Sequence, residues 1–155
     1  SGGITPWHVD QQYWPMDSSK SVTAWIPLQS TPLEMGPLCF GRGSHLKYIA
    51  RDVKISDESE RIIAQAIKKE KIIEIQVPYA LGDVSFHSGW TLHRAGGNAT
   101  EQPRKAHTII YMDEQMRLKK RRSQNQENDR ISWCGDTADG GVIDGPLTPI
   151  LYRAD

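Results

Sequence analysis

The chain has 155 residues, enough for a single domain with one core and too few for two ordinary domains. Its 19 Lys and Arg residues balance 19 Asp and Glu residues, so the net charge gives no reason to expect a nucleic-acid or membrane partner. The longest apolar runs are only a few residues, far below the roughly 20 that span a bilayer, and we expect a soluble protein.

Most of the chain consists of short segments rich in β-branched and aromatic residues and separated by Pro or Gly, which is typical of an all-β sandwich or barrel. In chain order, the predicted strands cover residues 5–11, 22–28, 38–40, 72–77, 84–87 and 105–112. In the last segment, apolar residues occupy both alternating sets of positions. This pattern favours an inner strand of a sheet.

One segment has helical rather than strand spacing. Asp57 followed by Glu60 matches a capping box, and apolar residues then recur at helical spacing from Ile62 to Ile67. We therefore expect one accessory helix of about three turns that ends near Lys69 and covers an open end of the sheet.

The chain changes character after Met112. A basic run at 117–122 is followed by polar residues at 124–129 and by a Gly-rich stretch around Gly140-Gly141. These features predict a loop region. We interpret the basic run as a solvated face, with a lid over an anionic substrate as the alternative.

The two cysteines, Cys39 and Cys134, lie far apart and form no C-x-x-C pair. Neither a disulfide framework nor a structural zinc site is indicated, and a reducing, cytoplasmic location is the simplest expectation. Ser1-Gly2-Gly3 lacks the charged and apolar regions of a signal peptide, and these residues do not enter the fold prediction.

His8-Val9-Asp10 falls in the first predicted strand, where the period of two places the His and Asp side chains on one face. Such a pair is common and can simply form hydrogen bonds on a wet sheet face. His93 is the best candidate for a third ligand, because it follows a predicted strand and turn and precedes a Gly-rich segment. Two imidazoles and one carboxylate form the facial triad of non-haem iron(II) oxygenases.

Three other histidines are alternatives to His93 as the third ligand. We expect His45 to stabilise a turn in Gly-Ser-His. His87, on the strand before His93, is expected to fill the core or support a ligand rather than bind a metal itself. His107 should point away from the metal.

Arg104 lies eleven residues after His93, a separation that allows the chain to turn at 96–98 and return along the next strand. Its guanidinium would then face the same cavity as the three candidate ligands. A planar fork of donors suits bidentate binding of a carboxylate.

Several short motifs follow one another at characteristic spacing: TPWHVD at 5–10, GPL at 36–38, GSH at 43–45, GDV at 82–84, and the run from His93 through Asn98 to Arg104. In order and spacing they resemble the phytanoyl-CoA dioxygenase family. The resemblance extends to the PILY sequence near the end of the chain. It implies a double-stranded β-helix, or jelly roll, that is cupin-like and binds iron(II) and 2-oxoglutarate.

Transferred residue by residue, the resemblance implies a role for each candidate site residue. The metal ligands fall on His8, Asp10 and His93. The arginine that binds the cosubstrate falls on Arg104, and a nearby hydroxyl, Thr108 or Ser85, is expected to assist it. Trp25 matches an aromatic position that borders the cosubstrate, although an inward Trp in a strand is more often simply part of the core.

The resemblance also implies a reaction: hydroxylation of a small organic substrate by dioxygen, with release of succinate and carbon dioxide. Asp10 favours hydroxylation, because halogenating relatives carry a small residue at that position. Two alternatives remain open, namely a non-catalytic cupin-like protein that holds a metal or carboxylate, and a zinc hydrolase in which Arg104 has no task. Substrate identity and oligomeric state are not predicted.

We expect one domain over residues 4–155. Members of the family carry a long segment before the H-x-D strand that includes further jelly-roll strands, and this chain has almost none. The jelly roll is therefore expected to lack N-terminal strands. We favour a fragment of a longer enzyme over a compact variant whose sheet edge is covered by a partner.

Overall fold

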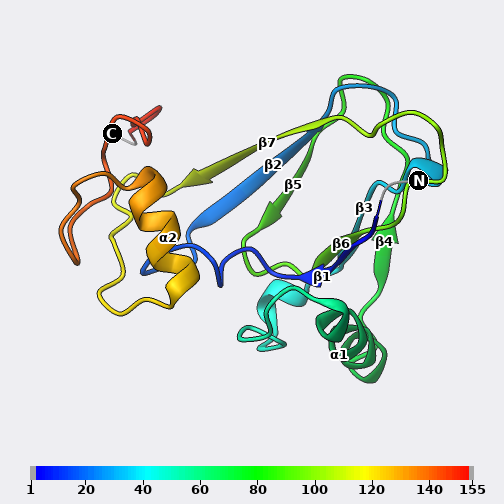
Figure 1. Cartoon of the computed structure of the whole chain (residues 1–155), viewed down its shortest axis with the longest axis horizontal. Coiled ribbons are helices and arrows are strands. Elements are labelled where there is room, and N and C mark those ends of the chain that lie inside the picture. Colours follow the sequence, from blue (N-terminus) through cyan, green and yellow to red (C-terminus); the bar gives the residue numbers. More distant parts are fainter. Residues whose placement is uncertain (1–2, 154–155) are drawn as a thin grey trace.

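The computed structural model describes residues 3–153, in which seven strands form two antiparallel sheets (Figure 1). The strands are β1 (Thr5–His8), β2 (Ser21–Pro27), β3 (Leu38–Gly41), β4 (Glu74–Gln76), β5 (Ser85–Ser88), β6 (His93–Ala95) and β7 (Ala106–Met112). One sheet has the order β1-β6-β3-β4 and the other β5-β2-β7. The predicted jelly roll is confirmed.

Apolar side chains from both sheets meet between them. Trp25 of β2 packs with Leu38 of β3, Ala95 of β6 and Tyr79, and all four are buried. The Trp25 and Tyr79 ring centroids are 4.9 Å apart. The two sheets therefore share an interior, and residues that point inward from one sheet face residues of the other.

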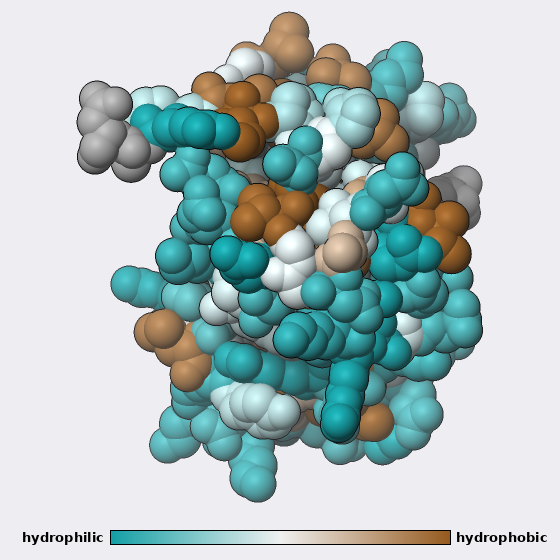
Figure 2. Space-filling model, turned by 90° about the vertical axis from the view of Figure 1, so that its left-hand side faces the viewer, coloured by the Kyte–Doolittle hydropathy of each residue, from teal (hydrophilic) through white to brown (hydrophobic). Residues whose placement is uncertain are grey.

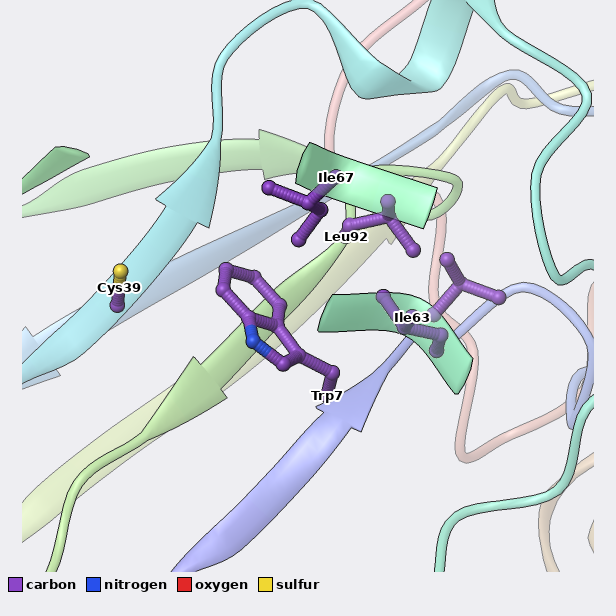
Figure 3. Close-up of a cluster of buried hydrophobic side chains, with 6 residues drawn as sticks. Trp7, Cys39, Ile63, Ile67 and Leu92 are labelled. Atoms are coloured by element: carbon purple, nitrogen blue, oxygen red, sulfur yellow. The ribbon is translucent and has the colours of Figure 1, made fainter. Parts of the chain in front are cut away.

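A second core lies between the four-stranded sheet and α1 (Asp57–Lys69), which Figure 1 shows beside β1. Its buried members are Trp7, Val9, Cys39, Ile63, Ile67 and Leu92. Figure 3 shows the indole of Trp7 beside the two isoleucines of the helix. Because Trp7 and Val9 flank His8, and Leu92 precedes His93, this packing orients both histidines toward the interior.

The helix spans the predicted residues, but its predicted cap is wrong by one position. Ser56 is the N-cap, and its hydroxyl accepts a hydrogen bond from the backbone of Ser59, whose hydroxyl in turn accepts one from Ser56. Glu60 instead accepts hydrogen bonds from the Trp7 backbone at 2.7 Å and from Arg94 at 2.6 Å. The carboxylate therefore joins the helix to the sheet, so it is not available for capping.

The prediction of a single helix and a loop after Met112 is also wrong. A second helix, α2 (Gln124–Trp133), begins at Ser123, which forms a capping box with Gln126. Gln126 is the buried residue of this helix, and its amide donates to the Gln12 carbonyl at 3.0 Å. Because α2 has no apolar stripe, the spacing of its apolar residues could not predict it.

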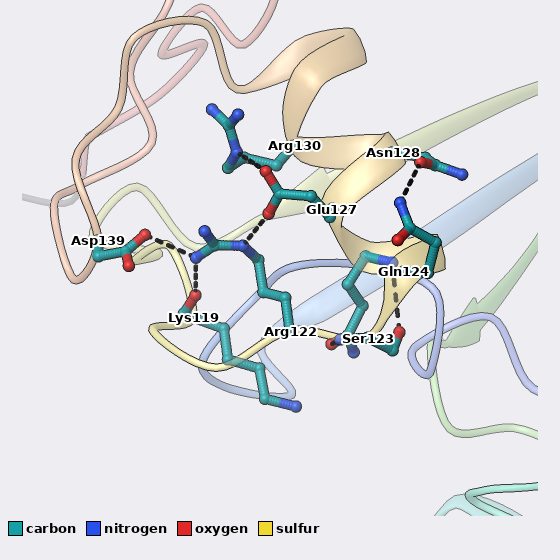
Figure 4. Close-up of polar contacts among 9 residues, drawn as sticks. Lys119, Arg122, Ser123, Gln124, Glu127, Asn128, Arg130 and Asp139 are labelled. Carbon is teal, nitrogen blue, oxygen red and sulfur yellow. Dashed lines mark hydrogen bonds and ion pairs between the residues drawn. The ribbon is translucent and has the colours of Figure 1, made fainter.

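The basic side chains of residues 117–122 are mostly solvated, as interpreted, with one exception. Lys119, Lys120 and Arg121 are exposed. Arg122 instead bridges Glu127 and Asp139, at 2.7 Å each, and joins the loop to α2 (Figure 4). The face that carries α2 is predominantly hydrophilic (Figure 2).

Strand 105–112 is not an inner strand. It forms β7 at the edge of the three-stranded sheet, where β2 is its partner within residues 3–153, and most of its residues are exposed. Neither helix in that range is long and apolar enough to cross a membrane.

Candidate metal centre

Three predicted ligands, His8, Asp10 and His93, lie together at one end of the four-stranded sheet. Their candidate ligand atoms are all within 4.8 Å of one another. Oδ1 of Asp10 is 3.5 Å from Nε2 of His8 and 3.6 Å from Nε2 of His93. The two imidazoles and one carboxylate oxygen thus converge on one point.

Strand pairing brings the two histidines together. His8 is the last residue of β1 and lies opposite His93, the first residue of β6, which is also paired with Phe40 of β3. The predicted strand 5–11 ends early, at His8, so Asp10 is in a bend. A hydrogen bond from the Gln11 backbone to the Gly89 carbonyl, 2.9 Å long, holds this bend against the chain after β5.

Each histidine is oriented by a backbone carbonyl. Nδ1 of His8 is 2.7 Å from the Pro6 carbonyl, and Nδ1 of His93 is 2.9 Å from the Thr91 carbonyl. A carbonyl oxygen can only accept, so each Nδ1 carries a proton, and in the neutral form of either ring Nε2 presents its lone pair toward Asp10. This arrangement is the one that metal-binding histidines usually have.

The charge states also suit a metal. Burial raises the pKa of Asp10, but the neighbouring imidazoles of His8, His87 and His93 outweigh it and hold this pKa well below its usual range. Burial lowers the pKa of His93 to about 4, against the opposing attraction of Asp10. At neutral pH the centre therefore offers a carboxylate and a neutral imidazole, the forms that bind metals.

His87 of β5 approaches Asp10 from the other sheet. Its Nε2 is 3.5 Å from Oδ2 of Asp10, and its ring centroid is 4.6 Å from that of His93. The remaining histidines, His45 and His107, are exposed and lie outside this group. His87 is thus a fourth side chain beside the three predicted ligands, and the sequence pattern alone did not reveal its contact with Asp10.

The guanidinium of Arg104 lies against three backbone carbonyls. Its Nη1 donates to the carbonyl of Gly36 and is 3.4 Å from those of Met35 and Gly96. Gly36 has a φ of 69°, and a side chain there would collide with the Gly96 carbonyl. The two backbone segments approach so closely that one guanidinium nitrogen can reach both.

The other predicted cosubstrate residues form one row across the three-stranded sheet. Trp25 of β2 lies opposite Ser85 of β5 on one side and Thr108 of β7 on the other. Trp25 is buried, the Ser85 hydroxyl is buried, and Thr108 is exposed. The structure therefore brings these three together, with the indole also part of the inter-sheet core.

A pocket of about 380 Å³ opens beside the site, and His87, Phe40 and Thr91 are part of its lining. Trp14 and Met16, which follow Asp10 in the chain, belong to a separate buried cluster, against which Tyr13 and Trp133 of α2 also pack. Phe40 was not singled out from the sequence, although its register opposite His93 follows from the pairing of β3 with β6.

The family model described as phytanoyl-CoA dioxygenase (PhyH) matches residues 1–106. No curated protein matches the chain.

Solved structures give further matches. The non-haem alpha-ketoglutarate-dependent epimerase SnoN from nogalamycin biosynthesis is 27% identical, with a TM-score of 0.72 over 98% of this chain and 56% of that one. The carbocyclase SnoK from the same biosynthesis is 28% identical, with a TM-score of 0.70 over 95% and 55%. AviO1 from Streptomyces viridochromogenes Tue57 is 26% identical, with a TM-score of 0.53 over 72% and 44%. The chain thus spans about half the length of these proteins.

Proposed function

Because the chain belongs to the phytanoyl-CoA dioxygenase family, we propose that it carries the metal centre of an iron(II)- and 2-oxoglutarate-dependent oxygenase. The main support is the convergence of Nε2 of His8, Nε2 of His93 and Oδ1 of Asp10. SnoN, one of the similar structures, has been solved with Fe3+, alpha-ketoglutarate and nogalamycin RO. Two imidazoles and one carboxylate suit non-haem iron(II) and leave positions open for cosubstrate and oxygen.

In this proposal His8, Asp10 and His93 hold the metal. The hydrogen bonds to the Pro6 and Thr91 carbonyls keep both imidazoles in the tautomer and direction that coordination requires. When bound, iron(II) and 2-oxoglutarate supply the chemistry that activates dioxygen. The contribution of the protein is to position these groups.

We assign the distal carboxylate of 2-oxoglutarate to Arg104, with Trp25 bordering the cosubstrate and the hydroxyl of Ser85 or Thr108 assisting. The cross-strand row through Trp25 supports this assignment, because it lies on the sheet that faces the metal ligands. A guanidinium can use a second edge for a carboxylate while Nη1 remains on the backbone carbonyls.

For the reaction we propose hydroxylation of a small organic substrate by dioxygen, with release of succinate and carbon dioxide. Asp10 supports it because the carboxylate ligand is retained. We also propose a single domain over residues 4–155 and a cytoplasmic location. Two free, buried cysteines, Cys39 and Cys134, agree with a reducing compartment.

The test is anaerobic addition of iron(II) and 2-oxoglutarate, followed by absorption spectroscopy. A weak metal-to-ligand charge-transfer band is expected for the wild type and for His107→Ala, which changes an exposed histidine. His93→Ala should abolish the band. No band in the wild type, or an equal band in His93→Ala, contradicts the proposal.

Turnover is tested separately. In air, the same mixture should release succinate from 2-oxoglutarate even without substrate, and Arg104→Ala should release less at low 2-oxoglutarate concentration. A charge-transfer band without any succinate would instead identify a non-catalytic binding protein.

A further inference from the structure

We propose that His87 is a positioning residue for the carboxylate of Asp10, a role that rests on the proposed metal centre and adds a residue to it. Its Nε2 holds Oδ2 of Asp10, so that Oδ1 stays turned toward His8 and His93. The family resemblance did not assign this contact. The contact joins β5 of the three-stranded sheet to the bend that follows β1.

The geometry divides the carboxylate between two sets of partners. Oδ1 lies 3.5 and 3.6 Å from the Nε2 atoms of His8 and His93, whereas Oδ2 lies 3.5 Å from Nε2 of His87. The first two histidines belong to the four-stranded sheet and His87 to the three-stranded sheet. Each carboxylate oxygen therefore has its own neighbours, and the oxygen next to His87 is not the one that faces the ligands.

Among residues 3–153, His87 has no other polar contact that accounts for its buried imidazole. Its side chain is 4% exposed, and neither ring nitrogen has a normal hydrogen-bond partner. A buried polar group left unpaired destabilises the fold, so such an imidazole is a poor choice for simple packing. Oδ2 of Asp10 is at the outer limit of hydrogen-bond distance, and a movement of a few tenths of an ångström would complete the bond.

The surroundings hold the imidazole in place for this contact. Its ring centroid is 5.2 Å from that of Phe40 and 4.6 Å from that of His93. On its own sheet, His87 lies opposite Thr23 of β2, which is also buried. The carboxylate moves more easily than the ring, because Asp10 lies in a bend and its side chain is 23% exposed.

This contact has a chemical consequence. A carboxylate that is free to rotate can bind a metal through both oxygens and occupy a position that cosubstrate or oxygen needs. A donor on Oδ2 restrains the carboxylate to one coordinating oxygen and keeps that position available. His87 therefore acts through Asp10 and does not itself bind the metal.

The test measures metal affinity in the absence of turnover. Mn(II) is titrated under anaerobic conditions, free Mn(II) is followed by electron paramagnetic resonance, and Co(II) absorption reports the coordination. His87→Phe keeps a ring but removes the donor, whereas His87→Gln keeps an N–H donor. We expect His87→Phe to raise the Kd roughly 10–100-fold and to alter the Co(II) spectrum, with substantial recovery of both in His87→Gln.

Two controls separate this role from others. His107→Phe makes the same change at an exposed histidine and should leave the Kd unchanged. Thermal unfolding of the metal-free variants identifies a loss of affinity that is due only to lost stability. If His87→Phe does not fold, His87→Asn replaces it, since its shorter side chain cannot reach Oδ2.

The outcomes are distinct. A folded His87→Phe with the Kd and Co(II) spectrum of the wild type overturns the proposal. A loss as complete as in His93→Ala, without recovery in His87→Gln, also overturns it, because His87 would then be a ligand. If the wild type itself binds neither metal, the proposed function fails and the role of His87 fails with it, whereas normal binding by His87→Phe removes only that role.

Discussion

Backbone carbonyls select the nitrogen of each imidazole that faces Asp10. His8 and His93 each hydrogen-bond, through Nδ1, to a carbonyl two residues earlier in the chain. The tautomer is therefore determined locally, and the pairing of β1 with β6 then brings the two Nε2 atoms together. The hydrogen bonds and strand pairing of the chain therefore orient both imidazoles toward Asp10.

The first prediction concerns pH and the stability of the metal-free protein. Burial lowers the pKa of His93 from 6.5 to about 4, so the unfolded state takes up the proton first as the pH falls. Stability is fully present above 6.5 and is lost progressively toward 4. Between pH 7 and pH 5 the free energy of unfolding should fall by about 2 kcal/mol through this residue. Urea unfolding at pH 7 and pH 5 measures this fall in the free energy of unfolding, which should be smaller in His93→Gln. An equal fall in the wild type and in His93→Gln would contradict the prediction.

The second prediction concerns the buried thiols. Burial raises the pKa of Cys134 to about 11 and also raises that of Cys39. Thiolate is the reactive form, so at pH 8 the native protein should react with a thiol reagent far more slowly than the unfolded protein. The time course of reaction with and without denaturant checks this. Rapid, stoichiometric reaction of either cysteine in the native protein is the contrary result.

At the scale of elements, α1 packs against the side of β1 and β6 that faces away from the metal centre. Its buried face contacts Trp7 and Leu92, each of which is next to a histidine of the centre in the sequence. Glu60 adds a polar connection to the Trp7 backbone. Packing on one face of β1 and β6 thus positions the ligands on the other face.

The third prediction tests this packing. Ile63 is fully buried, and Ile63→Ala should lower the free energy of unfolding by about 2–5 kcal/mol, through lost burial and a cavity. Gln65→Ala, at an exposed position of the same helix, should change it by less than about 0.5 kcal/mol. Denaturant unfolding provides the comparison. Similar values for the two variants would show that α1 does not share the core.

The fourth prediction concerns α2, which depends on capping and ion pairs rather than on a buried stripe. Ser123→Ala removes the acceptor for the Gln126 backbone and should destabilise the helix by about 0.5–2 kcal/mol. Amide exchange along residues 124–133 measures this. Ser132→Ala, at an exposed position in the last turn, is the control and should leave the exchange nearly unchanged.

At the scale of the whole molecule, metal binding should stabilise the fold. A ligand that binds only the folded state adds about 2.7 kcal/mol when its concentration is 100 times its Kd. Thermal unfolding with increasing Mn(II) should therefore show a rising Tm in the wild type. His93→Ala should show little change, and an equal rise in that variant would assign the effect to a different site.

Much of the architecture could be predicted because it is periodic. Six strand segments and α1 were predicted within a few residues, since strand and helix spacing is local information. The short strand β6 was not predicted, because three residues are too few to show a period. The edge position of β7 was also missed, because apolar residues on both faces do not reveal which neighbours a strand has.

The sequence by itself determined the family resemblance and the three candidate ligands, because His8 and Asp10 lie close in the chain and His93 belongs to a recognisable motif. Only the tertiary structure decided that His87 reaches Oδ2 of Asp10 and that Arg104 lies on the carbonyls of Gly36 and Gly96. The contacts of His87 with Asp10 and of Arg104 with Gly36 join segments distant in sequence and depend on how sheets and turns meet in space. Local spacing carries no information about such approaches.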